Sequence, residues 1–319
     1  MEYYYVSKSE WFKIVKEFSN VDYKGNIFHE IECLIPDDTL GVIVSSKNGT
    51  PILSSLFIKR RKHLFTLLDS YIPDMPFLGL RLQSKLSLRA YMDAVKVFEN
   101  AVFKKASIVR LVNHPVINDV RPFIWRGWNI IVQYTYITYP DRLDLKSLPK
   151  DARWLIRKGL KRDIEYVESS KTSDIEHFTR LLEEVMSRKN VEYNLSVVRR
   201  HLECILNSGK GRLYFAISRD TNEVIAGEFF LIDESRREAY RLYAASTVQA
   251  RRDGIAAALL YKTLSSLKEE SSVRKVYMLG ANVPSLSYFV EDYAHTVEPY
   301  YILVKGKSIL NTILKHYST

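Results

Sequence analysis

Three strand-like segments in succession, followed by a helix and a fourth strand, constrain the fold of this chain most strongly. Residues 213–218, 224–232 and 238–245 are rich in β-branched and aromatic side chains and are separated by short polar turns. An apolar helix pattern at 255–268 and a strand pattern at 275–279 come next. Strands joined by short turns pair antiparallel, whereas a helical crossover leads to a parallel neighbour. The sequence therefore predicts an α+β fold with a mixed, mainly antiparallel central sheet flanked by helices.

The first 140 residues contain a similar mixture of patterns. Strand patterns at 41–46 and 52–58 are followed by an amphipathic helix pattern at 88–104. A chain of 319 residues is long enough for two domains with a core each. A Tyr-Pro-Asp sequence ends a strand pattern near the middle of the chain, and we place the boundary there. The sequence thus predicts an N-terminal domain over 1–140 and a C-terminal domain over 141–319.

The chain is basic, with 47 Lys and Arg against 37 Asp and Glu and a net charge of +10. Residues 146–162 hold seven basic side chains and one acidic side chain. A helix pattern in this segment places Arg153 and Arg157 one turn apart on the same face, where they are candidates for contacts with substrate phosphates. A solvated amphipathic helix explains the same pattern. The charge favours an anionic partner, such as a phosphate-bearing cofactor, a nucleic acid or an acidic glycan, and it also favours solubility.

Several classes of protein are excluded by composition. Two cysteines are too few for a disulfide scaffold or a Cys-based zinc or iron–sulfur site, and the seven histidines show no metal-ligand spacing. No apolar run reaches the roughly 18 residues that a membrane helix needs. The N-terminus lacks the basic leader and the apolar block of a signal peptide. We therefore expect a cytoplasmic protein without a membrane span and without a catalytic metal.

The segment after the third strand pattern carries the clearest chemical signal. Thr247 to Leu260 contains the spacing Arg-x-x-Gly-x-Ala between a strand and a helix. The small residues Gly254 and Ala256 let the backbone approach a ligand, and the helix that opens there presents free N–H groups and the positive end of its dipole. Two arginines before the glycine add charge where phosphates would lie. The pattern fits a pyrophosphate-binding turn, and it also fits an ordinary helix start with a basic cap.

Residues 213–289 resemble the core of the Gcn5-related N-acetyltransferases (GNAT). The resemblance rests on Val224-Ile-Ala-Gly in a hairpin, on the Arg-x-x-Gly-x-Ala turn and on a strand that ends at Asn282. It is closest to the Fem-type branch, which fuses two such cores. The Fem-like segments are Asp119-Val-Arg-Pro-Phe-Ile-Trp-Arg-Gly-Trp, Arg153-Trp-Leu-Ile-Arg-Lys-Gly-Leu-Lys and Leu279-Gly-Ala-Asn. The resemblance implies two GNAT-like domains, of which the N-terminal one is degenerate.

This resemblance implies transfer of an acyl group from acyl-coenzyme A, such as acetyl-CoA, to an amine by direct attack in a ternary complex. Backbone amides of the turn would bind the CoA pyrophosphate, and the splayed end of the preceding strand would pair with pantetheine and offer an N–H to the thioester oxygen. The residues assigned in this way to the cofactor are Val248, Arg251, Arg252, Asp253, Gly254, Ile255, Ala256 and Asn282. The residues expected to contact the substrate are Arg153, Arg157 and Tyr243.

Two residues are candidates for proton transfer. The attacking amine must be neutral, so a lysine-type amine with a pKa of about 10.4 needs a base or a lowered pKa. Glu228 is the candidate base, and the alternative is a carboxylate on a half-exposed strand. Many GNAT enzymes use a tyrosine seven residues after the asparagine as the general acid. That position is Phe289 here, so we assign the acid to Tyr288, for which core packing is the alternative.

Two further functions remain compatible with the sequence. A Fem-like aminoacyltransferase would take its aminoacyl group from tRNA, which the basic helix and the net charge would bind. A GNAT-fold binding protein would have lost catalysis, in keeping with Phe289 at the acid position. The expected partner is an amine acceptor, with a phosphate- or nucleotide-bearing molecule as one option, and tRNA under the first alternative.

Overall fold

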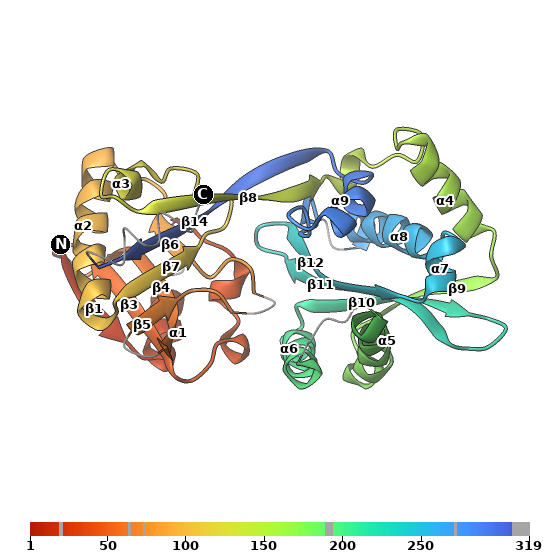
Figure 1. Ribbon diagram of the computed structural model, residues 1–319, viewed down its shortest axis with the longest axis horizontal. Coiled ribbons are helices and arrows are strands. Elements are labelled where there is room, and N and C mark those ends of the chain that lie inside the picture. The colour runs from red at the N-terminus through yellow and green to blue at the C-terminus, as the bar shows by residue number, and fades with distance from the viewer. Residues whose placement is uncertain (19–21, 63–64, 73–74, 189–193, 271–272, 308–319) are drawn as a thin grey trace. The chain divides into compact units, whose positions relative to one another are not determined.

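The computed structural model describes residues 1–18, 22–62, 65–72, 75–188, 194–270 and 273–307 (Figure 1). The chain divides into two compact units. The first contains Met1–Gln133 and the segment that begins at Pro299, and the second contains Tyr134–Glu298. Both units combine a sheet with helices, so the predicted α+β class is confirmed.

The first unit is built on a sheet whose strands lie in the order β1-β3-β4-β5-β7-β14, with β6 pairing with β4 and β2. All of the pairs recorded within it are antiparallel except β5 with β7, which is parallel. The strands are β1 (Glu2–Val6), β2 (Tyr23–Lys24), β3 (Thr39–Ser45), β4 (Pro51–Lys62), β5 (Phe65–Asp69), β6 (Leu80–Gln83), β7 (Ile108–Val112) and β14 (Thr296–Gly306). The helices are α1 (Lys8–Glu17), α2 (Leu88–Lys105) and α3 (Arg121–Ile124).

Helix α2 supplies much of the core of this unit. The side chain of Ser87 caps its N-terminus by accepting a hydrogen bond from the Ala90 N–H at 3.2 Å. Apolar residues at helical spacing, including Tyr91, Ala94 and Phe98, are buried against the sheet. The helix therefore sits where its sequence periodicity predicts.

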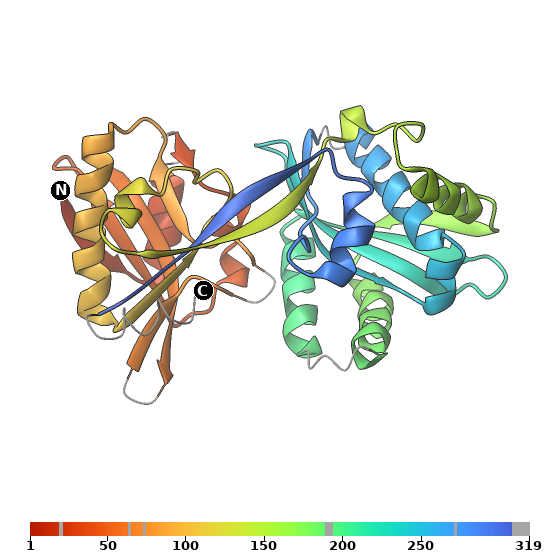
Figure 2. The same cartoon turned by 45° about the horizontal axis from the view of Figure 1, so that its top comes forward.

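The second unit has the strand order β8-β13-β12-β11-β10-β9. The pair β12–β13 is parallel, and the pairs β8–β13, β11–β12, β10–β11 and β9–β10 are antiparallel. Its strands are β8 (Asn129–Thr138), β9 (Ile164–Ser169), β10 (Gly211–Ser218), β11 (Val224–Asp233), β12 (Glu238–Ser246) and β13 (Lys275–Tyr277). Its helices are α4 (Lys150–Leu160), α5 (Ile175–Arg188), α6 (Leu195–Asn207), α7 (Val248–Arg252), α8 (Ile255–Glu270) and α9 (Pro284–Glu291). In Figure 2, α5 and α6 cover one face of this sheet and α4 and α8 the other.

The chain passes between the units twice. Strand β8 follows α3, yet its residues Ile137 and Thr138 pair with β13 in the second unit. Strand β14 follows α9, yet its residues 302–306 pair with β7 in the first unit. The sequence expectation of one boundary near residue 141 did not include the second passage, because a strand pattern does not reveal which sheet the strand joins.

Candidate active site

The sheet of the second unit splits between β12 and β13. Their parallel pairing covers only Glu238–Tyr240 and Lys275–Tyr277, whereas β12 continues to Ser246. On its other edge, β12 remains paired with β11 and has a bulge at Leu242, because Phe229 pairs with Tyr243 while Phe230 pairs with Arg241. The end of β12 therefore keeps one strand neighbour and leaves its other edge open.

A cavity of about 330 Å³ lies at this split. Its walls include residues 242–246 of β12, residues 278–280 after β13, and Ala256 and Ala257 at the start of α8. Leu279 and Gly280 both have positive φ angles, +53° and +72°, so the chain turns away from β12 immediately after β13. The volume is within the range of small-molecule sites, and the site lies entirely inside the second unit.

The start of α8 brings unsatisfied backbone donors to this cavity. The Gly254 carbonyl accepts the N–H of Ala258, and no acceptor among the described residues is recorded for the N–H groups of residues 255–257. The helix dipole adds positive potential at the same end. Arg251 of α7 lines the cavity too and has no ion-pair partner in the described part of the chain. This arrangement suits a doubly charged anion such as a diphosphate.

Gly254 has a different role from the one that the sequence suggested. It has φ +76°, and a Cβ on it would overlap the carbonyl oxygen of Leu155 in α4. A Cβ on Gly159 of α4 would in turn overlap the Gly254 carbonyl. The absent side chain thus lets α4 pack against the turn, and the expectation that it makes room for a ligand is corrected.

Asp253 and Arg252 are also turned toward α4. The Asp253 carboxylate accepts hydrogen bonds from Gln249 at 2.7 Å and from Arg162 at 2.5 Å, and these bonds hold its pKa below the usual value. Lys158 donates to the Arg252 carbonyl at 2.7 Å and lies 3.4 Å from Asp253. The backbone N–H of Asp253 bonds to the Gln249 carbonyl. Neither residue lines the cavity, and neither does Val248, whose side chain is exposed.

The side chain of Asn282 is hydrogen-bonded to the backbone of strand β8. Its side-chain oxygen accepts from the Tyr134 N–H at 2.9 Å, and its amide nitrogen donates to the Tyr134 carbonyl at 2.8 Å. Both groups of the carboxamide therefore serve the backbone of β8, and Asn282 is outside the lining of the cavity. The assignment of Asn282 to the cofactor receives no support from this geometry.

Glu228 and Tyr243 both line the cavity. Glu228 is 3% exposed, so the alternative of a carboxylate on a half-exposed strand is wrong. Its two oxygens accept from Arg241, from Nη2 at 3.0 Å and from Nε at 3.3 Å. Burial raises the pKa of Glu228, and the neighbouring Arg241 charge acts in the opposite direction. Sequence reasoning missed Arg241, because its contact with Glu228 depends on strand register.

Tyr288 lies outside the cavity. Its side chain is 75% exposed, so the alternative of core packing is wrong, and the side chain is not part of the cavity lining. The next residue, Phe289, lines the cavity instead. Arg153 and Arg157 are on α4 and outside the cavity lining, and Arg153 donates to the Lys146 carbonyl at 3.2 Å.

Among the described residues of the first unit, the parallel pair β5 with β7 has no equivalent open edge. Beyond that pair, the Ser70 N–H bonds to the Arg110 carbonyl, and the Ser70 hydroxyl accepts from the Val112 N–H at 2.8 Å. The Gly79 N–H bonds to the Val112 carbonyl at 2.8 Å. The chain itself therefore fills this split, and the side chain of Ser87 caps the N-terminus of α2.

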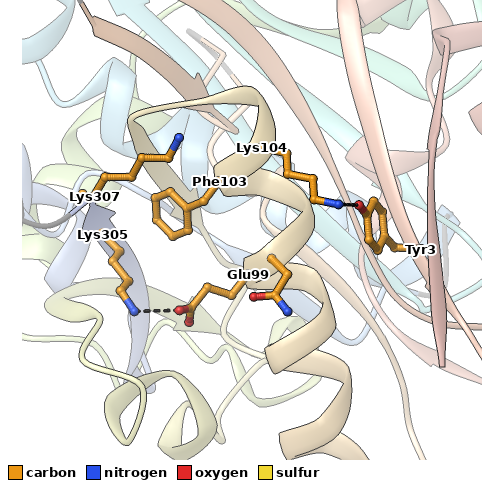
Figure 3. A pocket seen from close by; sticks show the side chains of 8 residues that line it. Tyr3, Glu99, Phe103, Lys104, Lys305 and Lys307 are labelled. Atoms are coloured by element: carbon orange, nitrogen blue, oxygen red, sulfur yellow. Dashed lines mark hydrogen bonds and ion pairs between the residues drawn. The ribbon is translucent and has the colours of Figure 1, made fainter.

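A second cavity in the first unit lies beside α2 and β14 (Figure 3). Its charges are largely engaged with neighbouring groups. Lys305 points to Glu99 at 2.9 Å and also donates to the Arg126 carbonyl, and Lys104 donates to the Tyr3 hydroxyl at 2.6 Å. These contacts join α2 to the neighbouring strands, and we assign no ligand to this cavity.

Among the residues that the structure describes, no three His, Cys, Asp or Glu side chains are grouped so that they could hold a metal ion. None of the helices in that part of the chain combines the length and the apolar character needed to cross a membrane.

The chain is similar in structure to solved proteins of low sequence identity. FemX superposes with a TM-score of 0.65 at 14% identity, over 99% of each chain. L-PGS from Bacillus licheniformis gives 0.62 at 13% identity, over 96% of this chain and 95% of that one. A tandem GNAT protein from the clavulanic acid biosynthesis pathway gives 0.54 at 11% identity, over 96% and 99%. No protein-family model and no curated protein matches the sequence. These likenesses confirm the predicted fold of two GNAT-like domains.

Proposed function

We propose that the unit formed by residues 134–298 transfers an acyl group from acyl-CoA, such as acetyl-CoA, to an amine acceptor. One observation carries the proposal: a single cavity is lined both by the open end of β12 and by the start of α8 with its unsatisfied amides. A donor with a diphosphate at one end and an amide-containing arm at the other matches both features.

In this proposal the diphosphate binds to the amides of residues 255–257 and to Arg251, where the helix dipole is favourable. The two amides of pantetheine extend the sheet along residues 242–246, as an added strand does. The thioester then lies near the bulge at Leu242, where an N–H on the open edge of β12 would stabilise the carbonyl oxygen as it gains charge. The open end of β12 and the start of α8 determine neither the acceptor nor the length of the acyl group.

The reaction that we propose is a direct aminolysis. The nitrogen of a neutral amine bonds to the thioester carbon, and the carbon–oxygen double bond opens to an oxyanion. The oxyanion collapses, the carbon–sulfur bond breaks, and its electron pair leaves with the sulfur. The ammonium proton passes to solvent and the CoA thiolate takes a proton from solvent. Holding donor and acceptor together supplies much of the rate gain.

A second candidate is an aminoacyl transfer from tRNA, which the exposed basic face of α4 favours. Arg157 and Lys161 are exposed on that face. One observation argues against this candidate. Aminoacyl-tRNA carries its aminoacyl group as an ester at the tRNA end, which has no diphosphate, so the unsatisfied amides of α8 would have no ligand. A binding protein without turnover is the third candidate, because Phe289 occupies a cavity position that a proton donor could have filled.

Acetyl-CoA should stabilise the protein saturably against thermal unfolding. Ligand present at 100 times its dissociation constant adds about 2.7 kcal/mol to the free energy of unfolding. We expect acetyl-pantetheine, which lacks the diphosphate, to stabilise far less. Differential scanning fluorimetry across a concentration series measures both.

The other candidates are tested in the same assay. Stabilisation by aminoacyl-tRNA, with no response to acetyl-CoA, would replace the proposal with the second candidate. Binding of acetyl-CoA without release of CoA across a broad panel of amines would favour the third. No response to any of these donors would remove the cavity as a donor site.

Asp253→Asn should leave acetyl-CoA affinity within about threefold of the parent. The Asp253 carboxylate faces α4, and its ion pairs are close to the surface, so we expect a loss of stability below about 1 kcal/mol. Isothermal titration with acetyl-CoA and chemical unfolding measure the two effects. A tenfold or larger loss of affinity would show that this side chain reaches the donor after all.

A further inference from the structure

The ion pair of Glu228 and Arg241 is the most buried charged feature of the cavity. The Glu228 side chain is 4% exposed and the Arg241 side chain 10%. Both carboxylate oxygens are engaged by the guanidinium. A buried pair of this kind contributes little net stability, so its presence in a cavity wall points to a role beyond holding the fold.

One guanidinium nitrogen of Arg241, Nη1, is available to bind a ligand. Nε and Nη2 donate to Glu228, and Nη1 has no acceptor in the part of the chain that the structure describes. The guanidinium carbon lies 5.9 Å from the centre of the Phe289 ring, on the α9 side of the cavity. A guanidinium cannot give up its proton in a protein, so its contribution would be electrostatic.

The proposed reaction creates negative charge at two atoms. The carbonyl oxygen lies beside the strand edge, where backbone N–H groups serve it. On the α9 side of the cavity, where we place the departing sulfur, Phe289 supplies only an apolar ring. Arg241 is next to the bulge residue Leu242 and faces Phe289, so its guanidinium lies beside the proposed thioester position.

We infer that Arg241 is a catalytic residue that stabilises the leaving thiolate, and that Glu228 is a positioning residue that aims Arg241 and does not act as the general base. This inference rests on the proposed function. Glu228 holds the planar guanidinium by two parallel bonds, which fixes the direction of Nη1. A carboxylate engaged in this way would have to break the pair before it could accept a proton from the amine.

The test compares acetyl-CoA with acetyl-seleno-CoA, which makes the same binding contacts but releases a far more stable anion. Hydroxylamine in excess serves as the acceptor because it is neutral at pH 7. CoA or seleno-CoA release is followed in single turnover, with the uncatalysed rate subtracted. The variants are Arg241→Lys, Glu228→Gln and the double variant Glu228→Gln with Arg241→Met, which removes both charges and avoids a lone buried one.

We expect the double variant to react about 100-fold more slowly than the parent with the thioester, which is the loss typical of removing one hydrogen bond to the transition state. With the selenoester, we expect its rate to fall less than threefold. Arg241→Lys and Glu228→Gln should show smaller losses of the same selectivity. Arg219→Met, at an exposed arginine of the β10–β11 turn, is the matched control and should leave both rates unchanged.

Four outcomes would overturn the inference. Equal losses with both donors would assign the pair to the carbonyl oxygen or to the fold. An equal loss with both donors in Glu228→Gln alone would overturn the role of Glu228 in positioning Arg241. A double variant that binds acetyl-CoA and keeps its thioester rate would remove Arg241 from catalysis while leaving the proposed function intact. A parent protein that neither binds nor turns over acetyl-CoA would overturn the proposed function and the inference together.

Discussion

Replacing Ala256 by glutamate should abolish saturable binding of acetyl-CoA while leaving the protein at least as stable as the parent. Ala256 lines the cavity in the first turn of α8, and no acceptor for its N–H is recorded among the described residues. A carboxylate there repels a diphosphate that would lie within a few ångströms. The same carboxylate interacts favourably with the helix dipole, by about 0.3–1 kcal/mol. We expect affinity to fall by 100-fold or more, measured by isothermal titration.

Ala256→Gln is the matched control for this variant. Glutamine has the size of glutamate without its charge, so a loss confined to Ala256→Glu isolates the electrostatic effect. An equal loss in both variants would indicate that bulk blocks the cavity, which still places the donor at α8. Parental affinity in Ala256→Glu, together with a parental melting temperature, would show that the diphosphate does not bind at this helix.

The local part of the site was predictable from sequence. The order of the strands, the position of α8 and its open N-terminus depend on residues close together in the chain. Arg251 and Ala256 line the cavity as their spacing indicated. Helical geometry also separates Tyr288 from Phe289, since adjacent residues are rotated by about 100°. Phe289 therefore lines the cavity, whereas the side chain of Tyr288 is exposed.

Asn282, Glu228 and Gly254 have contacts that the local sequence does not reveal. Asn282 bonds to Tyr134, which is 148 positions away. Glu228 meets Arg241 across two strands whose register includes a bulge. Pattern and spacing describe the neighbours of a residue along one element. They do not describe the residue that packing brings against it.

Gly254 is the clearest example, and replacing it should cost stability. Gly254→Ala places a Cβ against the Leu155 carbonyl and forces a non-glycine residue to φ +76°. The unfavourable backbone angle costs about 1–2 kcal/mol, and overpacking about 1–3 kcal/mol more. We expect a loss of about 3 kcal/mol or more, or roughly 10 °C in melting temperature, measured by chemical and thermal unfolding.

Gly209→Ala separates the two causes. Gly209 has nearly the same φ, +74°, and an added Cβ there meets nothing within 4 Å, so this variant should lose only the cost of the backbone angle. Equal losses at both positions would mean that α4 moves aside to admit the methyl group. Because α4 packs directly on the turn that leads into α8, weaker acetyl-CoA binding in a Gly254 variant would reflect a displaced helix. A test of the donor site therefore has to be made at Ala256, where the side chain faces the cavity, and a test of the packing at Gly254, where it faces α4.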